Sequence, residues 1–204
     1  MGEVFNGSIS YVADYQNHVE GLFNYPMFFT LHNVYGDGAS MYNIRVTYNS
    51  EQAAFKDVDA LGSFMNNHDN SRWLANWPGK ISGFKSAVTF AMTARGIPFF
   101  YYGDEQYFSG GNDPANRESL WNAMNTQSEM YQYVAKINKA RKAAQVWNFP
   151  YIERWVTDSF FAYSHGEMMV MTTNSNNTLD LSVTYHPYKN GDVVCNIFWP
   201  NDDC

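Results

Sequence analysis

The sequence predicts an α/β fold: half of a (β/α)8 barrel, followed by a truncated all-β domain. Residues 1–147 alternate short apolar runs with helical periodicity, a pattern typical of βα units around a parallel sheet. Residues 148–204 instead carry short alternating runs joined by polar turns. We therefore expect two domains, a partial (β/α)8 barrel over residues 1–147 and a partial antiparallel β-domain over residues 148–204.

Short apolar runs mark the strands expected in the parallel sheet. They lie at residues 2–4, 22–26, 61–65 and 96–103. Such a set makes half of a closed barrel, which leaves two sheet edges and the core open. We expect such a half-barrel to be unstable or prone to aggregation by itself.

Helical spacing of apolar residues predicts the elements between and after these strands. The expected helices cover residues 27–33, 80–94 and 128–144, the last with Ser128 as its N-cap. In the C-terminal part, residues 160–163 and 168–171 predict a β-hairpin, and the alternation over residues 179–185 predicts a further strand.

The composition excludes several classes of function. The net charge of -7 argues against nucleic acid and anionic membrane surfaces as partners. No apolar run is long enough to span a membrane, and no signal peptide follows Met1. The chain is rich in aromatic residues, with 15 Tyr, 15 Phe and 6 Trp. Many of these rings must form the core, but flat rings also suit the CH faces of a sugar.

Two kinds of modification site can be read from the sequence. Cys195 and Cys204 would most simply form a small local disulfide in a secreted protein; the alternative is two buried free thiols. Asn6 and Asn176 each fit the acceptor pattern for N-glycosylation.

Charged side chains follow two of the expected strands. Glu3 ends the first run, and His68, Asp69 and Arg72 follow the run at residues 61–65. The carboxyl ends of barrel strands are where barrel enzymes carry their active sites. A glycosidase needs two carboxylates there, one as general acid and one close to the sugar carbon.

These residues belong to a longer series of blocks that resembles the α-amylase family of glycoside hydrolases, in its fungal form. The blocks lie at residues 2–4, 15–17, 23–26, 67–70, 96–98, 103–106 and 110–118. The resemblance implies that the expected strands are strands 5–8 of the family's barrel. It also implies retaining endo-hydrolysis of α-1,4 bonds in starch or glycogen by an extracellular protein that is monomeric when complete.

The resemblance assigns roles to five side chains. Glu3 would be the general acid, and Asp69 would stabilise the oxocarbenium-like transition state. His68 would hydrogen-bond the same sugar ring, while Asp113 and Arg117 would hold a sugar further along the cleft. From the residues alone, His68 and Asp69 could equally form a solvated turn, and Asp113 with Arg117 a local ion pair.

Other charged residues received no assigned role. Arg72 matches a position that is often basic in the family, but a surface salt bridge explains it as well. The acids at residues 104–105 are expected to be surface charges.

The resemblance also implies that parts of the family's site are missing. The family's nucleophile and its calcium ligands precede the general acid, so we expect neither within this chain. We therefore expect a fragment of a secreted enzyme, inactive alone, whose intact form binds calcium. The alternatives are a non-catalytic starch-binding remnant and a related transglycosylase or maltogenic enzyme.

Overall fold

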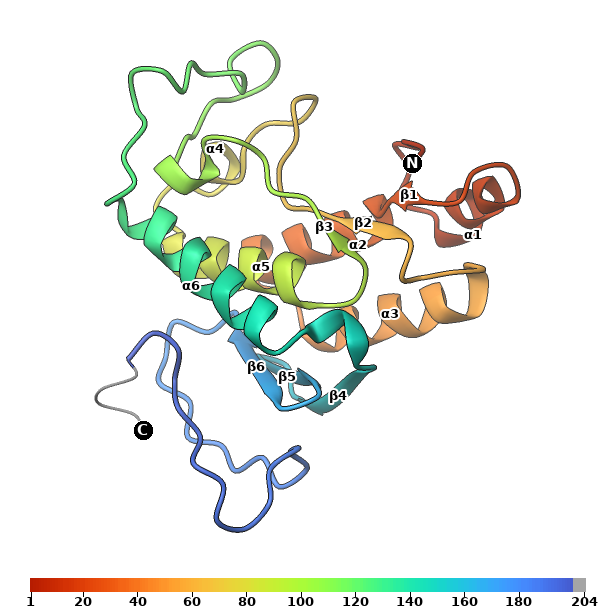
Figure 1. Cartoon of the computed structure of the whole chain (residues 1–204). Helices are drawn as coiled ribbons and strands as arrows, with labels where there is room; N and C mark the ends of the chain where they lie inside the picture. Colours follow the sequence, from red (N-terminus) through yellow and green to blue (C-terminus); the bar gives the residue numbers. More distant parts are fainter. Residues whose placement is uncertain (200–204) are drawn as a thin grey trace.

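The computed structural model describes residues 1–199, and a short parallel sheet lies at its centre (Figure 1). The strands β1 (Leu22–Phe23), β2 (Leu61–Ser63) and β3 (Ile97–Pro98) pair in chain order. Gly2 joins the outer side of β1 through a single parallel bridge to Leu22. The expected runs are thus side by side in the predicted order, but the regular strands are shorter than predicted. The numbering of these strands within a complete barrel stays a prediction.

Helices follow the strands and cover the sheet. The α-helices are α1 (Ile9–Asp14), α2 (Tyr25–Leu31), α3 (Tyr42–Ala54), α4 (Trp73–Asn76), α5 (Ile81–Thr93) and α6 (Glu129–Ala143). Shorter helical turns are η1 (Tyr15–Asn17), η2 (His32–Asp37, a π-helix), η3 (Asp104–Gln106) and η4 (Val146–Asn148). The predicted helices at 80–94 and 128–144 are confirmed as α5 and α6.

The ends of two helices follow from local chemistry. The Ser128 hydroxyl accepts a hydrogen bond from the Tyr131 amide, which confirms the predicted N-cap of α6. Helix α2 begins at Tyr25, two residues earlier than expected. The Asn24 side chain accepts from the Met27 amide there, and Pro26 suits the first turn.

Helix α3 was not predicted because its sequence lacks an apolar stripe. Only Ile44 and Glu51 of its residues are buried, and most of the others are polar. Packing against α1 and α2, rather than periodicity, holds this helix in place.

The C-terminal part forms an antiparallel sheet of β4 (Tyr151–Val156), β5 (Phe160–His165) and β6 (Met168–Thr173). The pairing of β5 with β6 confirms the predicted hairpin, whereas β4 was not predicted. The strand expected at residues 179–185 was wrong, because this segment has no regular structure and is mostly exposed. The alternating apolar residues of this segment therefore have no neighbouring element against which they could be buried. The expected pairing of Cys195 involves Cys204, which lies outside the described residues.

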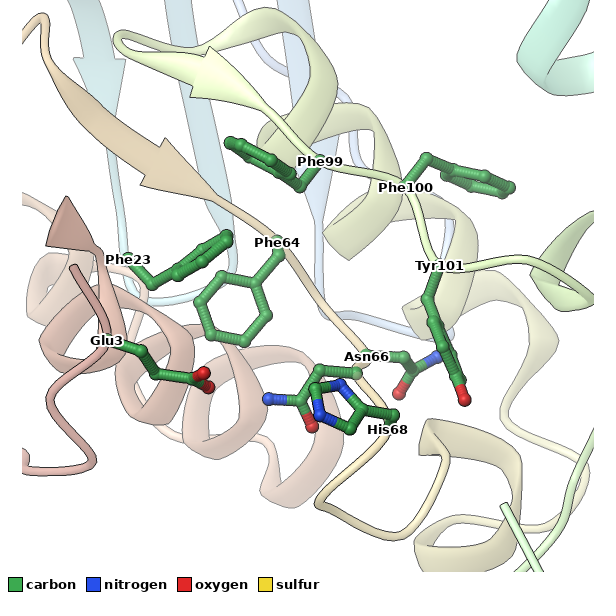
Figure 2. A pocket seen from close by; sticks show the side chains of 9 residues that line it. Glu3, Phe23, Phe64, Asn66, His68, Phe99, Phe100 and Tyr101 are labelled. Atoms are coloured by element: carbon green, nitrogen blue, oxygen red, sulfur yellow. The ribbon is translucent and has the colours of Figure 1, made fainter. Parts of the chain in front are cut away.

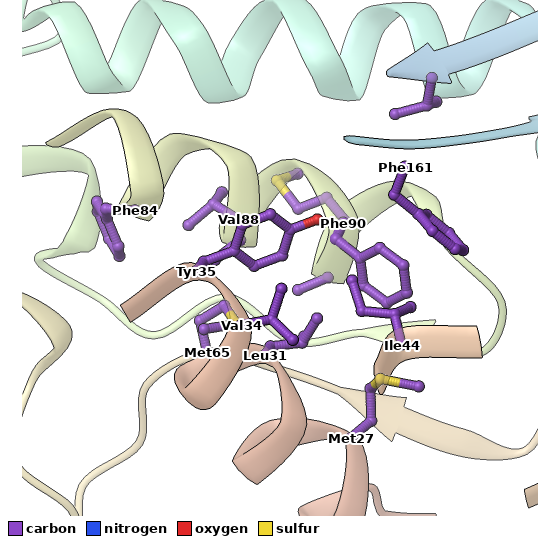
Figure 3. Packing of buried hydrophobic residues seen from close by; sticks show 14 of the residues in the cluster. Met27, Leu31, Val34, Tyr35, Ile44, Met65, Phe84, Val88, Phe90 and Phe161 are labelled. Carbon is purple, nitrogen blue, oxygen red and sulfur yellow. The ribbon is translucent and has the colours of Figure 1, made fainter. Parts of the chain in front are cut away.

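Both sheets contribute to one apolar core. Figure 3 shows Tyr35 beside Val88 of α5 and Leu31 near Val34 and Met65. Phe161 of β5 lies near Phe90, toward the end of α5. The Tyr163 hydroxyl also meets the Thr93 hydroxyl at 2.6 Å. Helix α5 is therefore packed between the parallel sheet and the antiparallel one. The predicted domain boundary after residue 147 stays a prediction, although the parallel strands precede it and the antiparallel strands follow it.

Candidate active site

The candidate site lies at the carboxyl ends of the parallel strands. A cavity of about 150 Å³ opens there between Glu3, the residues after β2 and the residues after β3. Figure 2 shows the Glu3 carboxylate pointing toward the loop that carries Asn66 and His68. Aromatic rings cover much of the remaining wall: Phe23, Phe64, Phe99, Phe100 and Tyr101.

A chain of hydrogen bonds connects Glu3 to the loop after β2. The buried Tyr25 hydroxyl donates to Glu3 Oε1 at 2.6 Å, and the Asn67 amide nitrogen donates to the Tyr25 oxygen at 2.8 Å. Burial raises the pKa of the Tyr25 phenol, and the hydrogen bond to Glu3 raises it further. Tyr25 therefore keeps its proton and holds one oxygen of the exposed Glu3 carboxylate in a fixed place.

The same Asn67 shapes the loop that carries His68 and Asp69. Its side-chain oxygen accepts from the Asp69 amide at 3.1 Å and from the Asn70 amide at 3.0 Å. The side chain of Asn116 is fully buried and holds the loop in place. Its amide nitrogen donates to the carbonyls of His68 at 2.9 Å and Asn70 at 2.8 Å. Backbone groups of this turn are thus paired, so the two side chains project from a defined frame.

The other predicted residues gather in one exposed cluster. His68 Nε2 lies 3.3 Å from Asp69 Oδ1, and Arg117 Nη2 lies 3.6 Å from the same oxygen. Arg117 Nε also contacts Asp113 Oδ1 at 2.9 Å and the His68 carbonyl at 3.2 Å. The local Asp113–Arg117 ion pair exists, but it is also joined to the His68–Asp69 pair. These four side chains form one polar surface, and Glu3 connects to it through Tyr25 and Asn67.

The expectation of a surface salt bridge for Arg72 was wrong, because this side chain is fully buried. Its guanidinium bonds Asp104 Oδ1 at 2.9 Å and Glu118 Oε2 at 2.7 Å, and lies 4.3 Å from the centre of the Tyr101 ring. Asp104 is equally buried, so it is not a surface charge either. Arg72 fastens the loop after β2 to the segment after β3.

The environment of Asp104 shows opposing effects. Burial raises the pKa of its carboxyl group, while hydrogen bonds from Asn66 at 2.9 Å and from Arg72 act against that shift. Removing either donor would leave a buried acid with less support.

Four functional positions were missed from sequence: Tyr25, Asn67, Asp104 and Asn116. Each lies in a block that carried the resemblance: Tyr25 begins α2, Asp104 begins η3, Asn67 lies in the loop after β2 and Asn116 lies in a turn. A polar side chain immediately after a short apolar run was the available signal, but its partners are distant in the chain.

Neither a cluster of metal-ligand side chains nor a bilayer-spanning helix occurs within residues 1–199. Between residues 1 and 199, no three His, Cys, Asp or Glu side chains come together in a group suited to a metal ion. Over the same range, no helix combines the length and apolar character needed to cross a bilayer.

Comparison with known proteins gives a consistent result. Residues 1–178 match the family model described as alpha amylase, catalytic domain. Alpha-amylase 1 of Schwanniomyces occidentalis is 33% identical over 97% of this chain. The Beta/alpha-amylase of Paenibacillus polymyxa is 37% identical over 87% of it. The chain spans 41% of the first relative's length and 16% of the second's.

A solved structure supports the fold as well. The α-amylase of Malbranchea cinnamomea matches 85% of this chain with a TM-score of 0.79 and 30% identity, and the match covers 38% of that protein. An α-amylase of Geobacillus thermoleovorans, solved in complex with acarbose, matches 79% of the chain at 27% identity and a TM-score of 0.69. The α/β fold with a partial barrel is therefore confirmed.

Proposed function

Because this chain belongs to the α-amylase family, we propose that it carries part of a glycoside hydrolase active site for α-1,4-glucosidic bonds. This part includes the general acid but not the nucleophile. The substrates would be starch, glycogen and malto-oligosaccharides. The observation that carries this proposal is the path from Glu3 through Tyr25 to Asn67, which joins a strand-end carboxyl to the His68–Asp69 loop.

Glu3 is the proposed general acid, giving its proton to the glycosidic oxygen that leaves. Tyr25 occupies only Oε1 of this carboxyl, so the second oxygen remains to face the substrate. Asp69, His68 and Arg117 present oxygen and nitrogen atoms on the adjoining surface, where they can bind sugar hydroxyls. The Asp69 carboxylate can also stabilise positive charge at the anomeric carbon. Asp113 would hold a sugar further along the cleft with Arg117.

Retention of configuration requires a nucleophilic carboxylate about 5 Å from the acid. By family resemblance this group precedes Glu3, so we propose that the 204-residue chain binds oligosaccharide without cleaving it. A complete enzyme would be a retaining endo-α-amylase that is monomeric, extracellular and calcium-binding, with calcium ligands outside this chain.

Two other functions compete with this proposal. A non-catalytic starch-binding protein would use the same aromatic cavity without needing a positioned acid, so the Tyr25–Glu3 contact favours the enzyme. A transglycosylase or maltogenic enzyme would share every residue described here and would differ in the sugar acceptor.

The first test is direct assay of the 204-residue chain. Soluble starch should release no reducing ends, while calorimetry should detect maltoheptaose binding. Cleavage of starch by this chain would contradict the proposal that the nucleophile lies outside it. Absence of maltoheptaose binding would contradict the proposal that the cleft at Glu3 binds oligosaccharide.

The second test uses any coding sequence upstream, joined in frame and assayed on starch. We expect hydrolysis that falls by several orders of magnitude in Glu3→Gln. The matched control is Glu20→Gln at an exposed position, which should keep full activity. Equal activity of the Glu3 and Glu20 variants would remove Glu3 from the mechanism.

A further inference from the structure

The loop after β2 is held by a histidine that neither the sequence motifs nor the proposed mechanism uses. His32 directly follows α2 as the first residue of η2, and its Nε2 lies 2.9 Å from the carbonyl oxygen of Met65. Met65 is 3% exposed, and no backbone amide within residues 1–199 donates to its carbonyl. The His32 ring therefore satisfies a buried acceptor at the point where the chain has just left β2.

The surroundings of His32 fix both the place and the protonation of its ring. Its centre lies 4.0 Å from the ring centre of Phe28, 5.3 Å from that of Trp73 and 5.2 Å from that of Trp77. Burial of the ring lowers the pKa of His32 to about 4, while the bond to the Met65 carbonyl acts against that shift. The ring is therefore neutral at pH 7. Because a carbonyl can only accept, the single N–H of this ring is on Nε2.

One helix thus holds the loop at two points. Tyr25 and His32 are seven positions apart, and the backbone at His32 is still helical, so both side chains leave the same face of the helix. The Tyr25 hydroxyl accepts from the Asn67 amide nitrogen at 2.8 Å, while His32 bonds the Met65 carbonyl. The spacing of these two side chains along α2 therefore sets the path of the loop from residue 65 to residue 67.

The residue between these two points is held by other elements. Asn66 Oδ1 accepts from the Trp73 amide at 2.8 Å, and its amide nitrogen donates to Asp104 Oδ1 at 2.9 Å. This stretch is therefore tied to α2, α4 and η3 directly before His68 and Asp69. Strand β2 has a strand on each side, so these contacts lie away from the open edges of the parallel sheet.

We propose that His32 is a positioning residue for the hydrolysis proposed above: by donating to the Met65 carbonyl, its ring fixes the direction in which the loop presents His68 and Asp69. The consequence for sugar rests on that proposed function, whereas the effect on the loop does not. The π-helical turn η2 begins at His32. Such turns are rare and often lie beside functional sites, which agrees with this role.

Two variants of the 204-residue chain separate the hydrogen bond of His32 from the packing of its ring. Both His32→Gln and His32→Asn lose the ring and supply an amide. In His32→Gln the amide nitrogen is as many bonds from Cβ as Nε2 is, so it can reach the Met65 carbonyl. In His32→Asn it stops one bond short. Any difference between the two variants therefore reports the hydrogen bond.

Hydrogen–deuterium exchange read by mass spectrometry tests the effect on the loop. Without the bond to Met65, the loop should open more often, so we expect amides of residues 66–70 to exchange about threefold to tenfold faster in His32→Asn than in His32→Gln. Exchange in α5 should be equal in the two variants. Equal loop exchange in the two variants, or the same acceleration in α5 as in the loop, would overturn the proposal.

Calorimetry with maltoheptaose tests the consequence for sugar. We expect His32→Asn to bind about threefold to tenfold more weakly than His32→Gln. Equal affinity in the two variants, combined with faster loop exchange in His32→Asn, would refute the positioning role. If the wild-type chain bound no maltoheptaose, the proposed function would fail, and the exchange result alone would decide whether His32 holds the loop.

A further measurement needs no variant and therefore does not depend on how well the variants fold. Nitrogen-15 NMR of the imidazole groups in the wild-type chain distinguishes the two neutral tautomers. We expect His32 to carry its proton on Nε2 at pH 7. A proton on Nδ1 would leave no donor for the Met65 carbonyl and would overturn the proposal.

Discussion

Arg72 and Arg117 bind carboxylates from the same pair of loops, yet they occupy opposite environments. Arg72 is completely buried between Asp104 and Glu118, whereas the Arg117 side chain is 46% exposed beside Asp69 and Asp113. Buried guanidinium groups are bound in fixed geometry, but exposed ones exchange partners with water and ligands. Arg72 therefore builds the site, and Arg117 remains available to a substrate.

The largest expected effect comes from replacing the buried member of this comparison. Arg72→Met leaves Asp104 buried without its cation, and we expect a loss of about 3–5 kcal/mol in the free energy of unfolding. Urea unfolding at pH 7 measures this loss. The matched control is Arg117→Met, the same substitution at the exposed site. Similar losses in the two variants would show that burial does not distinguish Arg72 from Arg117.

Glu51, unlike Asp104, is a buried carboxyl group that has no basic partner within residues 1–199. It is 3% exposed, its Oε1 has no hydrogen-bond partner within residues 1–199, and burial raises its pKa to about 8. In the unfolded chain a Glu titrates near about 4.3. The folded state then holds more protons than the unfolded state between these values, so stability falls as pH rises through this window.

The replacement Glu51→Gln should remove that pH dependence. We expect the variant to gain on the order of 2–4 kcal/mol relative to wild type between pH 5 and pH 8. Urea unfolding at both pH values tests this, with the exposed Glu20→Gln as control. A constant difference between Glu51→Gln and wild type would show that Glu51 does not titrate in this range.

Tyr25→Phe tests the connection between Glu3 and the loop. Without the hydroxyl, Glu3 loses a donor and the Asn67 amide loses its acceptor, so we expect a loss of about 1–2 kcal/mol in unfolding free energy. Maltoheptaose affinity should fall as the loop loosens. Tyr11→Phe is the control, since that hydroxyl is exposed and within residues 1–199 contacts only the Tyr15 hydroxyl. Equal unfolding free energies and equal maltoheptaose affinities in the two variants would show that Tyr25 does not position Glu3 or the loop.

The smallest change in stability is expected at Arg117. Its contacts with Asp113 and Asp69 are half exposed, so Arg117→Met should cost less than about 1 kcal/mol. Maltoheptaose affinity should nevertheless fall severalfold, because Arg117 lies on the proposed sugar-binding surface. Calorimetry measures that affinity. Loss of stability without loss of affinity would reverse the roles given to Arg117 and Arg72.

Sequence patterns predicted the elements whose signal is local. The amphipathic stripe of α5, the Ser128 cap of α6 and the β5–β6 hairpin are confirmed. Helix α3 was not predicted because its burial depends on contacts with other helices. The prediction of a strand at residues 179–185 was wrong because no other element covers this segment. Local patterns report what a segment can bury, but not whether a partner exists.

The sequence by itself determined the α/β class, the order of the parallel strands and the five side chains proposed to act on sugar. Those features depend on periodicity and on motif order, which are properties of the chain. Only the tertiary structure decided that Arg72 and Asp104 are buried and that Tyr25 bridges Glu3 to Asn67. It also brought His32 to the Met65 carbonyl. Burial and hydrogen bonding are set by groups far apart in sequence, so they exist only once the chain has folded.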